Sequence, residues 1–150
     1  MTVDFRKLGE VRFDDIKLPP ALPAGLYLGT IEKQTWDESR FENKNTGQKD
    51  GVMKYAVKLS GADESIAELV TDDMAVNGKT MFREYNIENA YDMVAWKEMV
   101  TALGISGTGK TIAELASEPV GHAVKVEVTQ RADKNDATRV FNDLRKIMAA

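Results

Sequence analysis

The chain of 150 residues contains no cysteine and a single histidine, His122. Without cysteine there are no disulfides, thiolate zinc sites or thiol nucleophiles, which fits a reducing compartment such as the cytoplasm. One histidine cannot supply a histidine-rich metal cluster or a convincing Ser-His-Asp set. His122 stands just before an expected strand, and we interpret it as a surface residue. We therefore expect a protein that is not an enzyme and that holds no metal and no cofactor.

The sequence also lacks a long apolar run. No segment approaches the roughly 18 apolar residues of a membrane-spanning helix. The first residues include Asp4, Arg6 and Lys7, unlike a secretory signal. A hydrophobic content of 43% and a charged content of 29% are typical of globular proteins. We expect one globular, cytoplasmic domain that makes no contact with a membrane.

Charge is unevenly distributed along the chain. Residues 59–120 contain 11 acidic and 4 basic residues, a net charge of −7. Residues 31–58 and 121–150 together contain 12 basic and 9 acidic residues, a net charge of +3. This segregation allows one basic face on a chain whose net charge is −4. A mixed, solvated surface explains the same counts equally well.

Residues 104–111 match the phosphate-loop pattern G-x-x-x-x-G-K-[ST] in full. A phosphate loop needs a buried strand that enters it and a helix N-terminus that leaves it. The preceding segment instead has helical spacing, with one apolar stripe formed by Met93, Trp96, Met99, Val100 and Leu103. A helix therefore enters this loop.

Capping signals give the same segment an ordinary explanation. Asn89, followed by Asp92, can cap the first helix, and Gly104 fits the left-handed position that ends it. Thr111 opens a T-x-x-E capping box for a short helix over 112–117. We interpret residues 104–111 as a linker between two helices. Binding of a nucleotide through Gly104–Thr111 remains a lesser alternative.

Five segments alternate or are composed like strands: 26–36, 52–59, 79–87, 123–131 and about 138–145. Gly29 indicates a bend or bulge in the first. Polar loops are expected over 37–50 and 132–137, and the acidic segment 60–77 is ambiguous, with a helical turn suggested by Ile66, Leu69 and Val70.

This order predicts a mainly β fold with a helical insert between the third and fourth strands. It is the order of the OB-fold, a five-stranded Greek-key barrel that binds oligonucleotides on strands 2 and 3 and on the loops joining strands 1–2 and 4–5. We expect an N-terminal arm over residues 1–24 and the OB-fold domain over 25–150.

Binding of a single strand without base readout needs cations along the backbone and aromatic rings that stack on bases. Tyr27, Tyr55 and Trp96 are expected in the core. Phe82 and Tyr85 lie on opposite faces of one strand, so one of them is core. Arg139, Phe141 and Arg145 share a face of the fifth strand. The residues expected to bind DNA are Trp36, Arg40, Phe41, Lys44, Lys54, Lys58, Phe82, Arg83, Lys125, Arg131, Lys134, Arg139 and Phe141.

Several phrases of the sequence resemble one protein family. They are Leu22–Tyr27 (LPAGLY), Gly78–Ile87 (GKTMFREYNI), Ala102–Ile105 (ALGI) and Val140–Ile147 (VFNDLRKI). Together they resemble bacteriophage single-stranded DNA-binding proteins of the OB-fold type, over about residues 22–147. The acidic 60–77 segment is longer than that family's hairpin, and the chain ends without the acidic tail found in many single-strand binders.

The resemblance implies a protein that binds single-stranded DNA during phage DNA replication or recombination in the bacterial host cytoplasm. It also implies a homodimer and phage or host replication and recombination proteins as possible partners. The alternative is a phage protein-interaction or inhibitor module whose acidic middle segment mimics nucleic acid.

Overall fold

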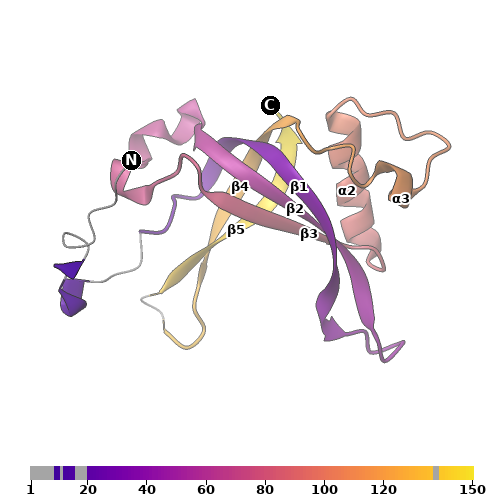
Figure 1. Ribbon diagram of the computed structural model, residues 1–150, viewed down its shortest axis with the longest axis horizontal. Coiled ribbons are helices and arrows are strands. Elements are labelled where there is room, and N and C mark those ends of the chain that lie inside the picture. The colour runs from indigo at the N-terminus through magenta and orange to yellow at the C-terminus, as the bar shows by residue number, and fades with distance from the viewer. Residues whose placement is uncertain (1–8, 11, 16–19, 137–138) are drawn as a thin grey trace.

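The computed structural model describes residues 9–10, 12–15, 20–136 and 139–150. The predictions made for the other residues of the N-terminal arm, and for Ala137 and Thr138, lie outside the described residues. Figure 1 shows the elements in chain order: η1 (Phe13–Asp15), β1 (Gly25–Glu42), β2 (Lys49–Ala62), η2 (Glu64–Leu69), η3 (Asp72–Met74), β3 (Thr80–Asn86), α2 (Ala90–Ala102), α3 (Ile112–Leu115), β4 (Ala123–Ala132) and β5 (Val140–Ala149).

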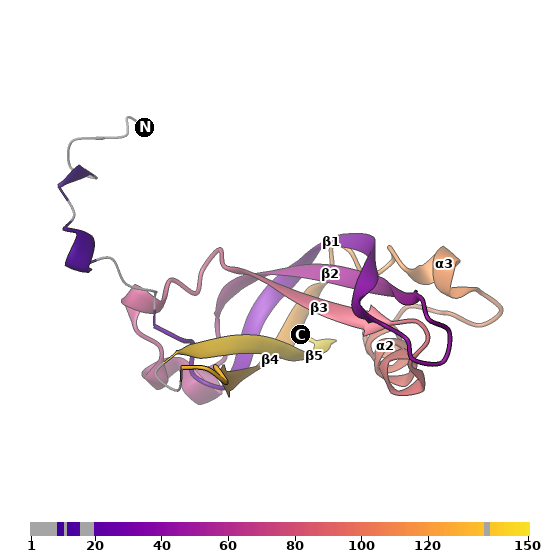
Figure 2. The same ribbon diagram turned by 90° about the horizontal axis from the view of Figure 1, so that it is seen from below.

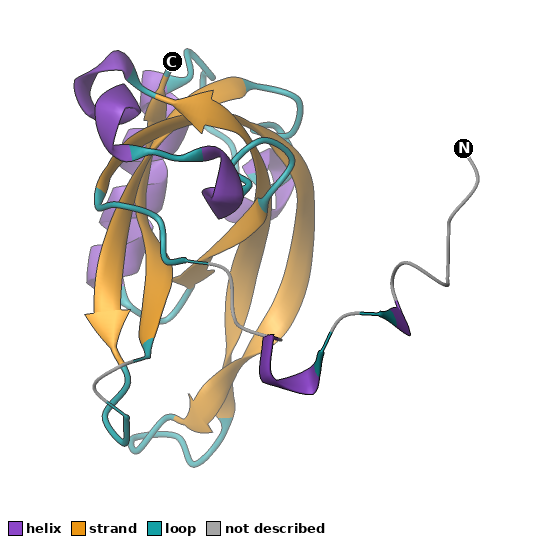
Figure 3. Cartoon of the chain, turned by 90° about the vertical axis from the view of Figure 1, so that its left-hand side faces the viewer, coloured by secondary structure: helices purple, strands orange, loops and turns teal. Residues whose placement is uncertain are grey.

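The five strands form one antiparallel sheet in the order β3-β2-β1-β4-β5. The predicted mainly β fold, with helices inserted between the third and fourth strands, is confirmed. The sheet is open, because no backbone ladder joins its edge strands β3 and β5 within the described residues. It is nevertheless strongly curved (Figure 3), and the two edges approach each other. The Arg83 Nε of β3 donates a hydrogen bond of 3.1 Å to the Arg145 carbonyl oxygen of β5.

The concave face of the sheet carries the core. On β2 the alternating side chains of Met53, Tyr55, Val57 and Leu59 are all buried, as their spacing predicts. Val124, Val126 and Val128 do the same on β4. The rings of Tyr27, Tyr55 and Trp96 are buried, as expected. Of Phe82 and Tyr85, which point to opposite faces of β3, Tyr85 is the buried residue.

The helical insert lies at one end of the molecule, and η2 and η3 lie at the other (Figures 1 and 2). Asn89 Oδ1 accepts a hydrogen bond of 3.1 Å from the Asp92 N–H at the start of α2. Gly104 follows that helix with φ = 78°, and the Thr111 hydroxyl accepts from the Glu114 N–H at 3.2 Å. These caps confirm the predicted helix–linker–helix, although α3 is shorter than the predicted 112–117.

Hydrogen bonds tie the insert to the sheet. Trp96 Nε1 donates to Tyr55 Oη at 2.9 Å, and Tyr55 Oη donates to the Ala116 carbonyl oxygen at 2.6 Å. The Tyr55 and Tyr85 rings meet edge to face, with centroids 5.8 Å apart. A strand residue, an α2 residue and the segment after α3 are thereby fixed to one another inside the core.

The first two strands are longer than predicted. Residues 37–50 were expected to form a loop, but β1 continues to Glu42 and β2 begins at Lys49. The expected loop was wrong because it was based on the absence of alternating aliphatic residues. Strands need such alternation only where one of their faces is buried, and this two-stranded ribbon extends past the core. Beyond the core this ribbon is held by backbone pairing and by polar contacts such as the Asp50 N–H to the Ser39 hydroxyl, 2.8 Å.

The predicted irregularity at Gly29 is confirmed by a shift in the β1–β2 register between Leu28 and Gly29. A Cβ at this position would lie only 2.7 Å from the Lys58 carbonyl oxygen, so the neighbouring strand leaves no room for a side chain.

Three other boundaries differ from the expectation or complete it. The ambiguous acidic segment contains two short 3-10 helices, η2 and η3. The fifth strand extends to Ala149, because its last residues pair with the start of β4. Leu22, within the range expected for the arm, is fully buried, and its N–H donates to Asn142 Oδ1 at 2.8 Å. Among the described residues, no helix has both the length and the apolar content needed to cross a membrane.

Candidate nucleic-acid interface

The convex face of β2 and β3 presents an exposed aromatic ring beside a lysine. Cross-strand register places Ala56 opposite Phe82 and Lys54 opposite Glu84, so these side chains share the outer face. Lys54 Nζ lies 4.6 Å from the centroid of the Phe82 ring. Phe82 is 52% exposed, which leaves ring surface open to a ligand. We call Lys54 and Phe82 the Phe82 cluster.

A second pairing of the same kind lies on the outer face of β4 and β5. Arg131 is the direct cross-strand partner of Phe141, and its guanidinium carbon lies 5.3 Å from the Phe141 ring centroid. The Arg139 guanidinium lies 5.0 Å from the same centroid. Phe141 is half-buried and both arginines are exposed. We call these three residues the Phe141 cluster.

A groove of about 340 Å³ runs between the edge strands and separates the two clusters. Its walls come from Lys79–Phe82 of the β3 edge and from Asn142–Leu144 of β5. Phe82 therefore stands on one wall and Asp143 on the other. Arg131 Nε is 3.0 Å from Asp143 Oδ2, which links the second wall to the Phe141 cluster. We call this feature the outer groove.

Most of the expected cations are paired with carboxylates. The nitrogen–oxygen distances are 3.9 Å for Lys54 with Glu84, 3.8 Å for Lys58 with Glu32, 3.2 Å for Lys125 with Asp63 and 3.0 Å for Arg131 with Asp143. The outer face is thus a mixed surface of ion pairs rather than a bare basic patch. A phosphate that binds there must compete with these carboxylates.

Trp36 lies on the other side of the ribbon from the Phe82 cluster. Its cross-strand partner is Met53, which points into the core, whereas Lys54 points outward. Trp36 is still 51% exposed: β2 remains paired with β3 at this level, but the pairing of β1 with β4 has already ended at Thr30. Further along the ribbon, Phe41 is 76% exposed and the Arg40 guanidinium lies 5.6 Å from its ring centroid.

The structure places Arg83 away from the outer groove. Its guanidinium lies 4.2 Å from the Tyr85 ring centroid and 4.0 Å from an Asp92 carboxylate oxygen. Together with the bond to the Arg145 carbonyl oxygen, these contacts give Arg83 a structural role between β3, β5 and α2. Sequence alternation places Arg83 on the opposite face from its neighbour Phe82, but it does not say which of the two faces is outward.

The remaining expected residues lie at the margins. Lys44 and Lys134 are exposed in the turns of the β1–β2 and β4–β5 hairpins. Figures 1 and 3 show that the ends of these hairpins project to the same side of the sheet. Arg145, on the outer face as predicted, is paired with Glu127 at 3.3 Å.

Three residues that sequence reasoning did not select extend the Phe82 cluster. Lys33, Thr35 and Asp37 of β1 line a small depression of about 150 Å³ with Lys54, Ala56 and Phe82. The irregularity between Ile31 and Lys33 brings Lys33 to the outer face, opposite Ala56. A bulge of this kind leaves no clear signal in the residue pattern, since Glu32 and Lys33 are both polar.

Shifted pKa values occur at groups with clear physical causes. Burial raises the pKa of Tyr55 and of Tyr85 to about 12. The Ser65 hydroxyl and N–H, assisted by Lys125, lower the pKa of Asp63 to about 2. Asp63 caps η2 and holds Lys125, so it fixes the segment that follows β2.

A comparison with protein-family models and a comparison with curated proteins give no match to this chain. Within the described residues, no three His, Asp or Glu side chains gather in a way that could hold a metal ion.

Proposed function

We propose that this chain binds single-stranded DNA with little sequence preference, and that its curved sheet is an open form of the OB-type barrel. The single observation that carries the proposal is the pair of clusters, Phe82 with Lys54 and Phe141 with Arg131 and Arg139, on opposite sides of the outer groove. Exposed rings beside cations suit the stacking of bases and the approach of phosphates, whatever the base.

Topology supports the OB assignment. The sheet order β3-β2-β1-β4-β5, with helices between β3 and β4, becomes the five-stranded barrel if β3 pairs with β5. The outer groove lies at this junction, next to strands 2 and 3, the face that such barrels use for oligonucleotides. The resemblance of the sequence to phage single-strand binders supports the same function, with phage replication or recombination as its setting and a homodimer as the expected assembly.

The paired carboxylates change the expected energetics. Because Glu84 and Asp143 already neutralise cations of the two clusters, stacking is expected to contribute more than net charge. Each stacked base contributes about 1–3 kcal/mol by alanine substitution. The dependence of affinity on salt should therefore be shallower than a count of surface lysines and arginines would give.

The decisive measurement is a fluorescence titration with oligo-dT over a series of salt concentrations, with duplex DNA of equal length as the comparison. We expect saturable binding of the single strand that weakens as salt rises, and weaker binding of the duplex. No binding of oligo-dT at low salt would exclude the proposal. Equal affinity for both forms would point to a general polyanion surface rather than a stacking groove.

A further inference from the structure

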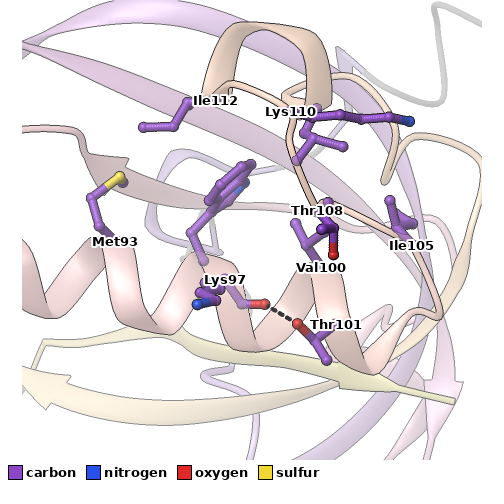
Figure 4. A pocket seen from close by; sticks show the side chains of 11 residues that line it. Met93, Lys97, Val100, Thr101, Ile105, Thr108, Lys110 and Ile112 are labelled. Atoms are coloured by element: carbon purple, nitrogen blue, oxygen red, sulfur yellow. Dashed lines mark hydrogen bonds between the residues drawn. The ribbon is translucent and has the colours of Figure 1, made fainter.

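The helical insert contains a pocket that plays no part in the outer groove. It has a volume of about 480 Å³ and lies between α2, the linker that follows it and α3. Figure 4 shows Met93 and Val100 of α2 facing Ile112 and Ile105 across this space. The apolar lining is completed by Trp96 and Leu115. We call this feature the insert pocket.

The walls of the insert pocket are fixed in place. Trp96 is held by its hydrogen bond to Tyr55, and Val100 is buried. The linker is tied to α2 by bonds from the Gly104 N–H to the Thr101 carbonyl oxygen, 3.0 Å, and from the Ile105 N–H to the Val100 carbonyl oxygen, 3.2 Å. A Cβ at Gly107 would lie 3.0 Å from the Leu115 side chain, so the linker passes close to α3. A preformed apolar pocket of this kind binds a ligand at a low cost in ordering.

Its charged lining has one sign. Among the described residues that line the insert pocket, the charged ones are Lys97 on α2 and Lys110 on the linker. They are two of only four basic residues in the otherwise acidic stretch 59–120. The nearby Glu114 carboxylate lies 3.2 Å from the Thr111 hydroxyl, within the cap of α3. An apolar space edged by two lysines is complementary to an apolar side chain that is flanked by carboxylates.

A nucleotide is a poorer fit, although Lys110 belongs to the phosphate-loop pattern. A phosphate loop offers its backbone N–H groups, yet the N–H groups of Gly104, Ile105 and Lys110 are used within the protein. The element that enters the linker is α2, and α3 spans only Ile112–Leu115. The geometry lacks the strand and the long helix on which phosphate binding depends.

We propose that the insert pocket is a docking site for a segment of a partner protein in which a large apolar side chain stands beside aspartate or glutamate. The pocket shares no lining residue with the outer groove, so a partner and a DNA strand can be bound at the same time. The proposal does not depend on DNA binding.

The test uses Trp96 as a local reporter. The chain has two tryptophans, so the Trp36→Phe variant leaves Trp96 as the one tryptophan, inside the pocket. Three short synthetic peptides are titrated: one with leucine and phenylalanine among aspartates, one with serines in place of the apolar residues, and one with lysines in place of the aspartates. We expect a saturable change in Trp96 emission with the first peptide and at least about tenfold weaker binding of the other two.

Variants of the pocket distinguish specific binding of the peptide there from non-specific binding elsewhere on the surface. Reversal of both charges, Lys97→Glu with Lys110→Glu, should lower the affinity for the first peptide about tenfold. Lys49→Glu, at an exposed position outside the pocket, should leave that affinity unchanged. Ile112→Ser, at a position that is 37% exposed, should weaken the peptide while the far-ultraviolet spectrum stays native. No response to the first peptide, or equal binding before and after the double reversal, overturns the proposal. A saturable response to magnesium-ATP with none to the peptide overturns it in favour of a nucleotide site.

Discussion

Aromatic rings occur in two contrasting regions of this protein. Beside the outer groove, Phe82 and Phe141 are at least partly exposed, and cations lie within 5.3 Å of their ring centroids. In the core next to the helical insert, Tyr55, Tyr85 and Trp96 are buried. There Tyr55 and Trp96 are joined to each other and to a backbone carbonyl oxygen by direct hydrogen bonds, and the Arg83 guanidinium lies against Tyr85, 4.2 Å from its ring centroid.

The difference between the two regions teaches how to separate stability from binding. The Tyr55 hydroxyl and the Trp96 indole N–H are hydrogen-bonded inside the protein, so these two rings stabilise the fold and can offer a ligand only apolar surface, as Trp96 does in the insert pocket. The groove rings keep exposed surface, so they add little to stability and are available for stacking. Substitutions in one region should therefore leave the property of the other unchanged.

The largest effect is expected from Trp96→Ala. Loss of a buried indole and of its hydrogen bond to Tyr55 should lower the free energy of unfolding by about 3–5 kcal/mol. Chemical denaturation measures this change. Trp36→Ala is the matched control, because Trp36 is 51% exposed, and it should alter the free energy of unfolding by no more than about 0.5 kcal/mol. Equal destabilisation by both variants would show that the ribbon side chain is also part of the core.

A smaller effect, on binding alone, is expected from Phe82→Ala and Phe141→Ala. Each should weaken the binding of oligo-dT by about 1–3 kcal/mol, because one stacking contact is lost. The melting temperature of the protein should change little. Leu69→Ala is a suitable control. Leu69 is 60% exposed on η2, and it does not line the outer groove. Unchanged affinity in both phenylalanine variants would remove the outer groove as the site of binding.

The smallest effect is expected from the carboxylates that pair with cations of the two clusters, Asp143 and Glu84. Asp143→Asn frees Arg131 from its ion pair, and Glu84→Gln does the same for Lys54. Exposed ion pairs contribute about 0.2–1 kcal/mol, so each variant should bind oligo-dT up to about fivefold more tightly, with a steeper dependence on salt. Glu88→Gln, at an exposed position after β3, is the charge-matched control. Weaker binding by the two groove variants would mean that these carboxylates position the cations for DNA.

Much of the fold could be predicted from local patterns. The alternation of Met53, Tyr55, Val57 and Leu59 identified the buried face of β2, and the caps at Asn89 and Thr111 located both helices. The outer ribbon was missed because its strands bury no face and carry no apolar alternation. Its pairing comes from backbone bonds that begin in the core and continue outward.

The candidate site was predictable only in part. Alternation predicted an outward-facing Lys54 on β2 and a shared face for Arg139 and Phe141 on β5, but it left open which of Phe82 and Tyr85 is buried on β3. Arg83 and Trp36 could not be sorted, because the direction of each side chain depends on register and on how far the strand extends past the core. The pairing of Arg131 with Asp143 likewise depends on cross-strand contacts that a sequence pattern does not contain.

The sequence by itself determined the element order, the buried faces of β2 and β4 and the helix caps, because these depend on residues close together in the chain. The tertiary structure alone decided that β3 and β5 approach, that the outer groove lies between them, and that its cations are matched by carboxylates. It also decided that residues 104–111, which match the phosphate-loop pattern, form one wall of an apolar pocket. Such features arise where distant segments meet, and their energetics depend on distances that curvature and register set.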